Sequence, residues 1–293
     1  MADFLVLCGQ TGEMVVPQTK FARNGGVRIA YQTLGDGPCD LLVVPGLVSH
    51  VGLIWDDPDQ ARFYEGLAAF ARVIVYDKRG TGLSDRTVAI PAMDERIADT
   101  LAVMDAAKST RTAVLGISEG GKMALTLAAR HPGRVRALAL YGAFARSPTQ
   151  EWPASQVATR FNLIERAWGT GLLPPTMAPS RASDENFRRI WSRFERESAS
   201  QAVAGALLRM DHDVDVSDVL PTVRAPTLLM HRTGDQRIGV EYGRELAARM
   251  RAAHYIELPG DDHLPQIGDS SRVIAEIEAF LTNVVSGSAS AAA

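Results

Sequence analysis

Short apolar runs alternate with longer amphipathic segments along most of the chain. The runs predicted as strands are Leu41–Val44, Val73–Tyr76, Ala113–Leu115, Ala137–Tyr141, Thr227–Met230 and Tyr255–Leu258. Most of them lack an apolar–polar alternation, which is typical of strands buried on both faces of a parallel sheet. The segments with helical periodicity are 61–71, 93–107, 121–130, 240–250 and 271–285. This pattern predicts an α/β fold with a mostly parallel central sheet flanked by helices.

Two segments depart from this alternation. Residues 19–37 favour an antiparallel hairpin, with its turn at Asn24-Gly25-Gly26. Residues 147–219 contain no strand-like run, but they carry helical patterns rich in aromatic residues. We therefore expect a helical cap at 147–219, inserted into a core formed by 19–146 and 220–285. Residues 1–18 would form an N-terminal extension, and the Ser/Ala-rich residues 286–293 a disordered tail.

Composition and charge narrow the classes of partner. The net charge is −3 and no basic block is present, so no nucleic-acid partner is expected. No apolar stretch approaches the roughly 20 residues that cross a bilayer, and the first residues lack the basic start of a signal peptide. Cys8 and Cys39 are too few for a disulfide framework. We expect a cytoplasmic protein with no membrane insertion, and the oligomeric state stays open.

The central motif for chemistry is Gly116-Ile117-Ser118-Glu119-Gly120. It follows an apolar strand and precedes an Ala/Leu-rich helix, as a nucleophile elbow requires. A sharp strand-to-helix turn strains the serine backbone and brings both glycines so close to their neighbours that a Cβ atom would clash. Ser118 is therefore the predicted nucleophile.

A serine hydroxyl needs a base to take its proton, and the base needs an acid to orient it. His263 lies in the loop just after the last predicted strand, where the base of such a serine is expected. Asp235 follows the preceding strand and is the predicted acid. His254 and His131 fit structural positions, and His231 is expected to pack near the site without acting.

A tetrahedral intermediate needs two backbone N–H donors. The N–H of Glu119, next to the nucleophile, is one candidate, and the N–H of Leu47, after the first parallel strand, is the other. The Glu119 side chain has two open interpretations: a partner in the surroundings of the site, or merely a favourable charge at a helix start, which we favour.

Metal and cofactor sites are not expected. The segment Asp211–Asp215 resembles the start of a calcium loop, but Val216 stands where that loop needs Gly. The glycine-containing segment Asp77–Asp85 lacks the spacing of a phosphate-binding loop.

Together these motifs resemble the α/β-hydrolase superfamily. More narrowly, the chain is similar from about residue 20 to 285 to the hydrolase module found fused to class III adenylate/guanylate cyclases. Gly116–Gly121 is the most specific of the shared motifs, and the others are Phe21–Gly25, Ile29–Gln32, Val44–His50, Asp77–Asp85, His231–Asp235 and Leu258–Leu264. The resemblance implies carboxylesterase activity with Ser118, Asp235 and His263 as triad. Pro45-Gly46 stands where many relatives have His-Gly.

These features predict a serine hydrolase for small-molecule esters. The inner face of the cap is expected to be apolar, and the mixed charges between residues 185 and 197 to face solvent, which favours neutral esters with small or medium acyl chains. The residues predicted to bind substrate are Phe161, Leu163, Trp168 and Leu172. Thioesterase, lactonase, perhydrolase and C–C bond hydrolase activity stay open, because the same triad serves them. The alternative from another class is a slow-turnover receptor or signalling protein.

Overall fold

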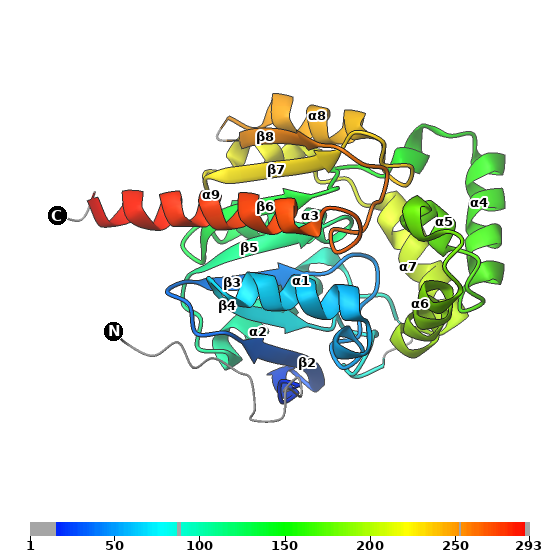
Figure 1. Cartoon of the computed structure of the whole chain (residues 1–293), viewed down its shortest axis with the longest axis horizontal. Helices are drawn as coiled ribbons and strands as arrows, with labels where there is room; N and C mark the ends of the chain where they lie inside the picture. Colours follow the sequence, from blue (N-terminus) through cyan, green and yellow to red (C-terminus); the bar gives the residue numbers. More distant parts are fainter. Residues whose placement is uncertain (1–15, 87–88, 252, 291–293) are drawn as a thin grey trace.

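An eight-stranded sheet forms the centre of the molecule in the computed structural model, which describes residues 16–86, 89–251 and 253–290 (Figure 1). The strand order is β1-β2-β4-β3-β5-β6-β7-β8. Strand β2 is antiparallel to both of its neighbours, and all other pairs are parallel. The strands are β1 (Lys20–Asn24), β2 (Val27–Leu34), β3 (Asp40–Val44), β4 (Arg72–Tyr76), β5 (Thr112–Ile117), β6 (Val135–Tyr141), β7 (Thr227–Arg232) and β8 (Ala253–Leu258). The predicted fold is confirmed.

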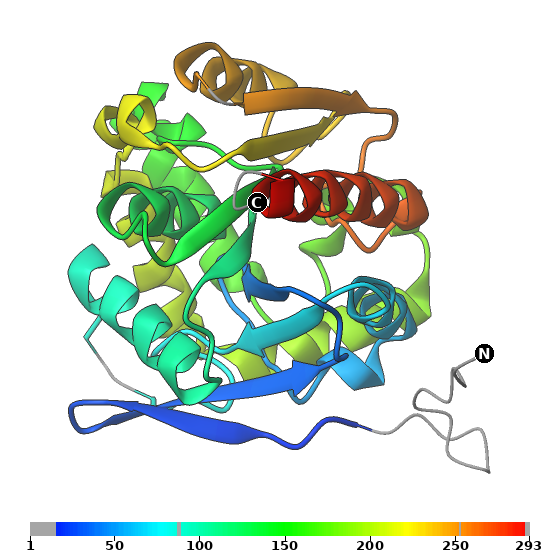
Figure 2. The same ribbon diagram turned by 90° about the vertical axis from the view of Figure 1, so that its left-hand side faces the viewer.

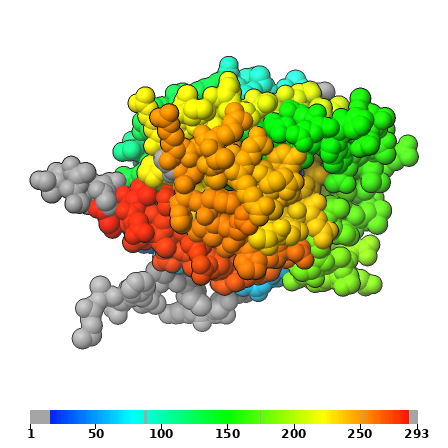
Figure 3. All heavy atoms as spheres, turned by 90° about the horizontal axis from the view of Figure 1, so that it is seen from above, coloured from blue at the N-terminus to red at the C-terminus, as the bar shows by residue number. Residues whose placement is uncertain are grey.

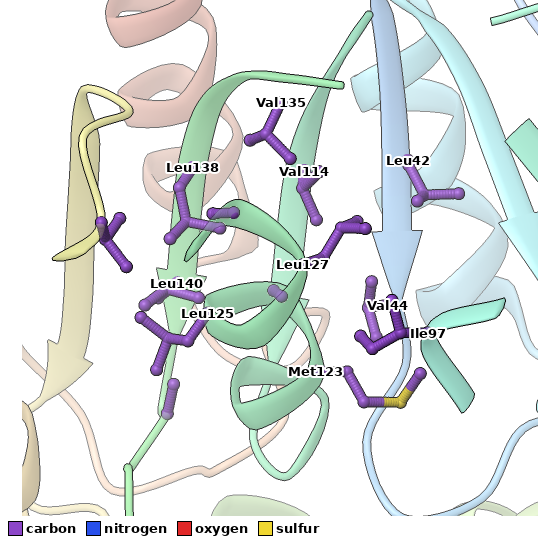
Figure 4. Close-up of a cluster of buried hydrophobic side chains, with 14 of the residues drawn as sticks. Leu42, Val44, Ile97, Val114, Met123, Leu125, Leu127, Val135, Leu138 and Leu140 are labelled. Carbon is purple, nitrogen blue, oxygen red and sulfur yellow. The ribbon is translucent and has the colours of Figure 1, made fainter. Parts of the chain in front are cut away.

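Helices cover both faces of this sheet (Figure 2). Helices α1 (Pro58–Ala68) and α9 (Ser270–Ser290) pack on one face, and α2 (Met93–Ala106), α3 (Gly120–Arg130) and α8 (Val240–Arg249) on the other. Leu125 and Leu127 of α3 lie over Val114, Leu138 and Leu140 of the central strands (Figure 4). Because the central strands are buried on both faces, their sequences are apolar without alternation.

The ends of the chain differ in part from the prediction. The hairpin turns at Gly25-Gly26 as expected, with Asn24 paired to Val27. The tail predicted to be disordered from 286 onward instead continues α9 as far as Ser290. Alanine and serine are compatible with a helix that packing against the core has already begun. Cys8 and most of the predicted extension lie outside the described residues.

The predicted cap lies between β6 and β7 and forms one end of the molecule, opposite the C-terminal end of α9 (Figures 1 and 3). Its last residues return to the core earlier than the predicted boundary, because Val216 already packs with Leu220 and Val223 in the main core cluster. Its elements are η2 (Pro148–Glu151), α4 (Ala154–Ala167), α5 (Pro174–Met177), η3 (Pro179–Arg181), α6 (Glu185–Ser198), α7 (Gln201–Asp213) and the start of η4 (Ser217–Thr222).

The parallel strands all end at the edge of the sheet that faces the cap (Figure 1). Loops at the carboxyl ends of parallel strands are the usual place for a binding or catalytic site. Within the described ranges, no helix combines the length and apolarity that crossing a membrane would need.

Candidate active site

Ser118 sits at the tip of a strained turn between β5 and α3. Its φ is +54°, a left-handed conformation that non-glycine residues rarely adopt. A Cβ atom on Gly116 would come within 2.8 Å of the Ala124 Cβ, and one on Gly120 within 2.4 Å of the Pro45 carbonyl oxygen. Both glycines are therefore required by close packing, as the motif predicts.

Ser118, His263 and Asp235 form a continuous chain of hydrogen bonds. The His263 Nε2 atom lies 2.8 Å from Ser118 Oγ, and its Nδ1 atom lies 2.7 Å from Asp235 Oδ2. Gly142 leaves room for the imidazole: with a φ of +55°, it would place a Cβ atom 3.1 Å from His263 Cε1. The structure thus brings together the three residues that the sequence predicts as a triad.

Asp235 is held as an anion by its surroundings. Its Oδ1 atom accepts hydrogen bonds from the backbone N–H groups of Arg237, at 2.8 Å, and Ile238, at 3.0 Å. Burial alone would raise the pKa of this carboxyl, but the charge of His263 and hydrogen bonds from His231, His263 and the Ile238 N–H hold the pKa below its usual range. An ionised carboxylate in this position orients the imidazole and stabilises its cation.

The other histidines near the sheet do not reach Ser118. His231 Nε2 donates to the Ile238 carbonyl oxygen at 2.9 Å, and it also lies 3.5 Å from Asp235 Oδ2. Since a carbonyl oxygen only accepts, this nitrogen carries the proton. His254 is exposed on β8, at the edge of the sheet. His231 therefore packs beside the acid, as expected, without contacting the nucleophile.

The two predicted oxyanion donors belong to residues that border the same space as Ser118. Leu47 and Glu119 line the same cavity as Ser118, and a Cβ atom on Gly46 would lie 3.7 Å from the Ser118 Cβ. In the described part of the chain, neither the Leu47 nor the Glu119 backbone N–H donates to a protein acceptor. Both N–H groups are available to a substrate oxygen.

The Glu119 side chain belongs to a buried charge cluster, which we define as Lys78, Arg96 and Glu119. Glu119 Oε2 lies 2.6 Å from Lys78 Nζ, and Oε1 lies 2.5 Å from Arg96 Nη2. Lys78 Nζ also donates to the Gly46 carbonyl oxygen. All three side chains are nearly inaccessible to solvent. The favoured interpretation of Glu119 as a simple helix-start charge is therefore wrong: it links the nucleophile elbow to the loop that carries Leu47.

Replacing Glu119 by glutamine should destabilise the fold by about 3–5 kcal/mol, because Lys78 and Arg96 would stay buried without their counter-charge. Burial alone would raise the pKa of Glu119, but Arg96 and Lys78 lower it from 4.5 to about 2. The lowered pKa means that this stabilisation is complete above about pH 4.5 and is lost as the pH falls toward 2. Urea unfolding at pH 7 and at pH 3 measures both effects, and the difference between variant and wild type should be smaller at pH 3.

The exposed ion pair between Asp94 and Arg130 provides the control. Asp94→Asn should change the free energy of unfolding by less than about 1 kcal/mol, as is usual for surface pairs. Equal effects of the two substitutions would show that the buried cluster contributes no more than a surface pair.

A cavity of about 360 Å³ lies between the cap and the carboxyl ends of the strands. Phe161 and Trp168 line it, in agreement with the sequence prediction. Leu163 and Leu172 do not, and their prediction as substrate-binding residues is wrong: they are 58% and 62% exposed. Leu163 lies on the outer side of α4, since Phe161 and Ile164 mark the buried side. Leu172 follows Gly169 and Gly171, which both have a positive φ. Helical periodicity therefore does not predict which way the Leu172 side chain points.

The cavity wall also contains residues that the sequence analysis missed. Arg160 of α4 and Arg237, two residues after the acid, both line it. Glu195 of α6 lines it as well, although the charges of that segment were expected to face solvent; it is 1% exposed and accepts hydrogen bonds from Trp191 Nε1 and the Gly169 N–H. Arg160 lies three residues after Val157 and four before Ile164, so helical periodicity could have placed it on the buried side of α4. Among the described residues, no cluster of three or more His, Cys, Asp or Glu could hold a metal ion.

The chain is similar in sequence to known hydrolases. The sequence model of the Alpha/beta hydrolase family matches residues 41–277. The pimeloyl-[acyl-carrier protein] methyl ester esterase of Chromobacterium violaceum is 27% identical over 257 residues, which cover 84% of this chain and 96% of that relative. The narrower resemblance to the hydrolase module found fused to class III cyclases is not among these similarities and stays a prediction.

Solved structures give the same fold. An enol-lactonase from Burkholderia xenovorans superposes with a TM-score of 0.74 at 24% identity, covering 90% of this chain and 100% of that one. A thermophilic esterase from Thermogutta terrifontis gives a TM-score of 0.73 at 23% identity, covering 91% and 99%. At these identities the similarity concerns the fold and not the substrate.

Proposed function

Because this chain belongs to the alpha/beta hydrolase family, we propose that it is a serine hydrolase that cleaves carboxylic esters with small or medium acyl chains. The observation that carries the proposal is the hydrogen-bonded chain from Ser118 through His263 to Asp235, with Ser118 facing a cavity. This arrangement matches the geometry of a nucleophile, its general base and the acid that orients the base.

In the proposed mechanism, His263 Nε2 takes the proton from Ser118 Oγ as that oxygen attacks the ester carbonyl carbon. The carbonyl oxygen becomes an oxyanion, which accepts hydrogen bonds from the N–H groups of Leu47 and Glu119. Collapse of this intermediate breaks the bond to the alcohol, which leaves with the proton from His263. Water then attacks the acyl-enzyme in the same way, with His263 again as base, and releases the acid.

The protonated imidazole formed at each step lies beside the Asp235 carboxylate, whose pKa stays below its usual range. Asp235 therefore remains an anion while His263 gains and loses its proton. Metal ions and organic cofactors have no step in this mechanism.

The cavity supports the size of the proposed acyl group. Aromatic and aliphatic side chains of the cap form one wall of the cavity. They include Phe161 and Ile164 of α4, Trp168 just after it, and Trp191 of α6. In a series of 4-nitrophenyl esters from acetate to palmitate, kcat/KM should therefore be highest at short or middle chain lengths. The optimum should be broad, because one methylene changes the transition-state free energy by only about 1–3 kcal/mol.

Two variants of α4 make this experiment specific. Phe161→Ala should enlarge the cavity and move the optimum toward longer chains, whereas Leu163→Ala, on the exposed side of the same helix, should leave the profile unchanged. A preference of the wild type for palmitate would contradict the proposed acyl size. Absence of activity on every ester, thioester and lactone in a panel would contradict the proposed reaction, and very slow turnover on all of them would favour a receptor.

A further inference from the structure

Two arginine side chains face the cavity in which Ser118 lies. Arg160 is on the buried side of α4, one residue before Phe161 and four before Ile164. Arg237 enters the same cavity from the loop after β7. One guanidinium thus comes from the cap and the other from the core, with the nucleophile in the same space.

Arg237 has a fixed position relative to the triad. Its backbone N–H donates to Asp235 Oδ1 at 2.8 Å, which ties the backbone of this loop to the acid. Burial, and then the positive charge of Arg160, lower the pKa of Arg237 to about 10. Arg237 nevertheless stays protonated at neutral pH, and the two guanidinium groups are close enough to repel each other.

Neither guanidinium has a hydrogen-bond or ion-pair acceptor among the residues that the structure describes, and Arg160 Nε is buried without a partner. Asp211 and Asp235 attract Arg237 only at a distance. Planar guanidinium groups bind carboxylates through paired, charge-assisted hydrogen bonds. Two of them without an acceptor therefore indicate an anionic ligand.

The carboxylates that line this cavity are engaged elsewhere. Glu119 is bound within the buried charge cluster. Asp211 forms an ion pair with the fully buried Lys122 at 2.9 Å. Burial raises the pKa of Glu195 to about 7, which reduces its negative charge at neutral pH. The balance of charge at the cavity wall is thus positive.

We propose that Arg160 and Arg237 form a subsite for a carboxylate carried by the ester substrate, so that the preferred substrates are half-esters or other esters of acidic molecules. The inference rests on the proposed function for the ester bond, and it adds the charge of the substrate. It replaces the expectation of neutral esters, which assumed an entirely apolar inner face of the cap. Binding of the carboxylate would also join the cap to the core across the site.

The test compares acidic substrates with neutral isosteres that pass through the same triad. One pair carries the group on the acyl side, mono-4-nitrophenyl adipate against 4-nitrophenyl adipamate. The other carries it on the alcohol side, 3-carboxyphenyl butyrate against 3-carbamoylphenyl butyrate. In at least one pair, kcat/KM of the wild type should be higher for the acid. Arg160→Gln and Arg237→Gln should each lower the acid-to-amide ratio on the order of tenfold or more, as expected for hydrogen bonds to a charged group.

The acid-to-amide ratio of kcat/KM distinguishes loss of the subsite from general damage to the enzyme. Damage to the triad lowers kcat/KM equally for both substrates of a pair and leaves this ratio unchanged. Arg166→Gln, on the exposed side of α4, should leave the ratio and the activity unchanged. Arg160→Lys should retain part of the preference, because the charge remains. Equal rates of the wild type on acid and amide in both pairs, or an unchanged ratio in both glutamine variants, would overturn the proposal.

Binding measurements separate this proposal from that of the reaction. Monoethyl adipate should bind to the Ser118→Ala variant in calorimetry, and diethyl adipate should bind more weakly. Adding Arg160→Gln and Arg237→Gln should remove this difference. If the wild type hydrolyses no ester but the Ser118→Ala variant still discriminates the two adipates through these arginines, the reaction is wrong and the anion subsite stands. If ester hydrolysis is found without such discrimination, the subsite is wrong.

Discussion

Ester turnover should fall by at least 10⁴-fold when Ser118 is replaced by alanine. The substitution removes the only oxygen within hydrogen-bond distance of His263 Nε2 in the described structure, so no acyl-enzyme can form at this position. The predicted oxyanion donors, the N–H groups of Leu47 and Glu119, remain, and we expect them to set the residual rate. Steady-state kinetics on 4-nitrophenyl butyrate measure the loss of turnover, and covalent labelling with a fluorophosphonate probe identifies the nucleophile directly.

The probe should attach once, to the peptide that contains Ser118, and labelling should disappear in Ser118→Ala. Ser155→Ala, an exposed serine at the start of α4, should keep both labelling and turnover. Attachment to another residue, or near-normal turnover in Ser118→Ala with an unchanged melting temperature, would show that the nucleophile lies elsewhere.

Replacing His263 by alanine should reduce kcat on the order of 10³-fold or more, because Ser118 Oγ loses the acceptor for its proton. His231 offers a demanding comparison, since it is also buried and also lies within 3.5 Å of Asp235. His231→Ala should cost far less in kcat, because Asp235 keeps its bonds to His263 and to two backbone N–H groups.

His254→Ala, on the exposed edge strand, should leave kcat and stability unchanged. Urea unfolding of every variant is needed, since the loss of a buried imidazole lowers stability on its own. If His231→Ala lowers kcat as much as His263→Ala without a change in stability, the base has been assigned to the wrong histidine.

The predicted triad could be read from the sequence because each member follows a strand. Ser118 directly follows β5, and Asp235 and His263 lie in the loops after β7 and β8; the carboxyl ends of these parallel strands meet at one edge. Order along the chain was therefore enough to bring together residues that are 145 and 28 positions apart. The pairing of Glu119 with Lys78 and Arg96 could not be found this way, because it depends on which side chains turn inward after β4 and along α2.

The cap shows where the sequence pattern was insufficient. Aromatic content identified the cap as the wall of a cavity and placed Phe161 and Trp168 correctly. An apolar residue is not necessarily an inward one, however, and Leu163 is exposed while Arg160 faces the cavity. A helix that covers a polar site carries charge on its buried side, so hydrophobicity alone does not indicate which side faces the substrate.

The buried charge cluster has a consequence for how this sequence can diverge. Lys78, Arg96 and Glu119 come from three separate parts of the chain, and the one carboxylate of Glu119 binds both cations. Loss of Glu119 leaves two buried cations without their counter-charge, and loss of either cation leaves one buried Glu119 oxygen without its partner, whereas a joint replacement by packed apolar residues need not be harmful. Mutations at these positions should therefore be strongly epistatic, and descendants of this protein are expected to inherit the three residues together or to lose them together.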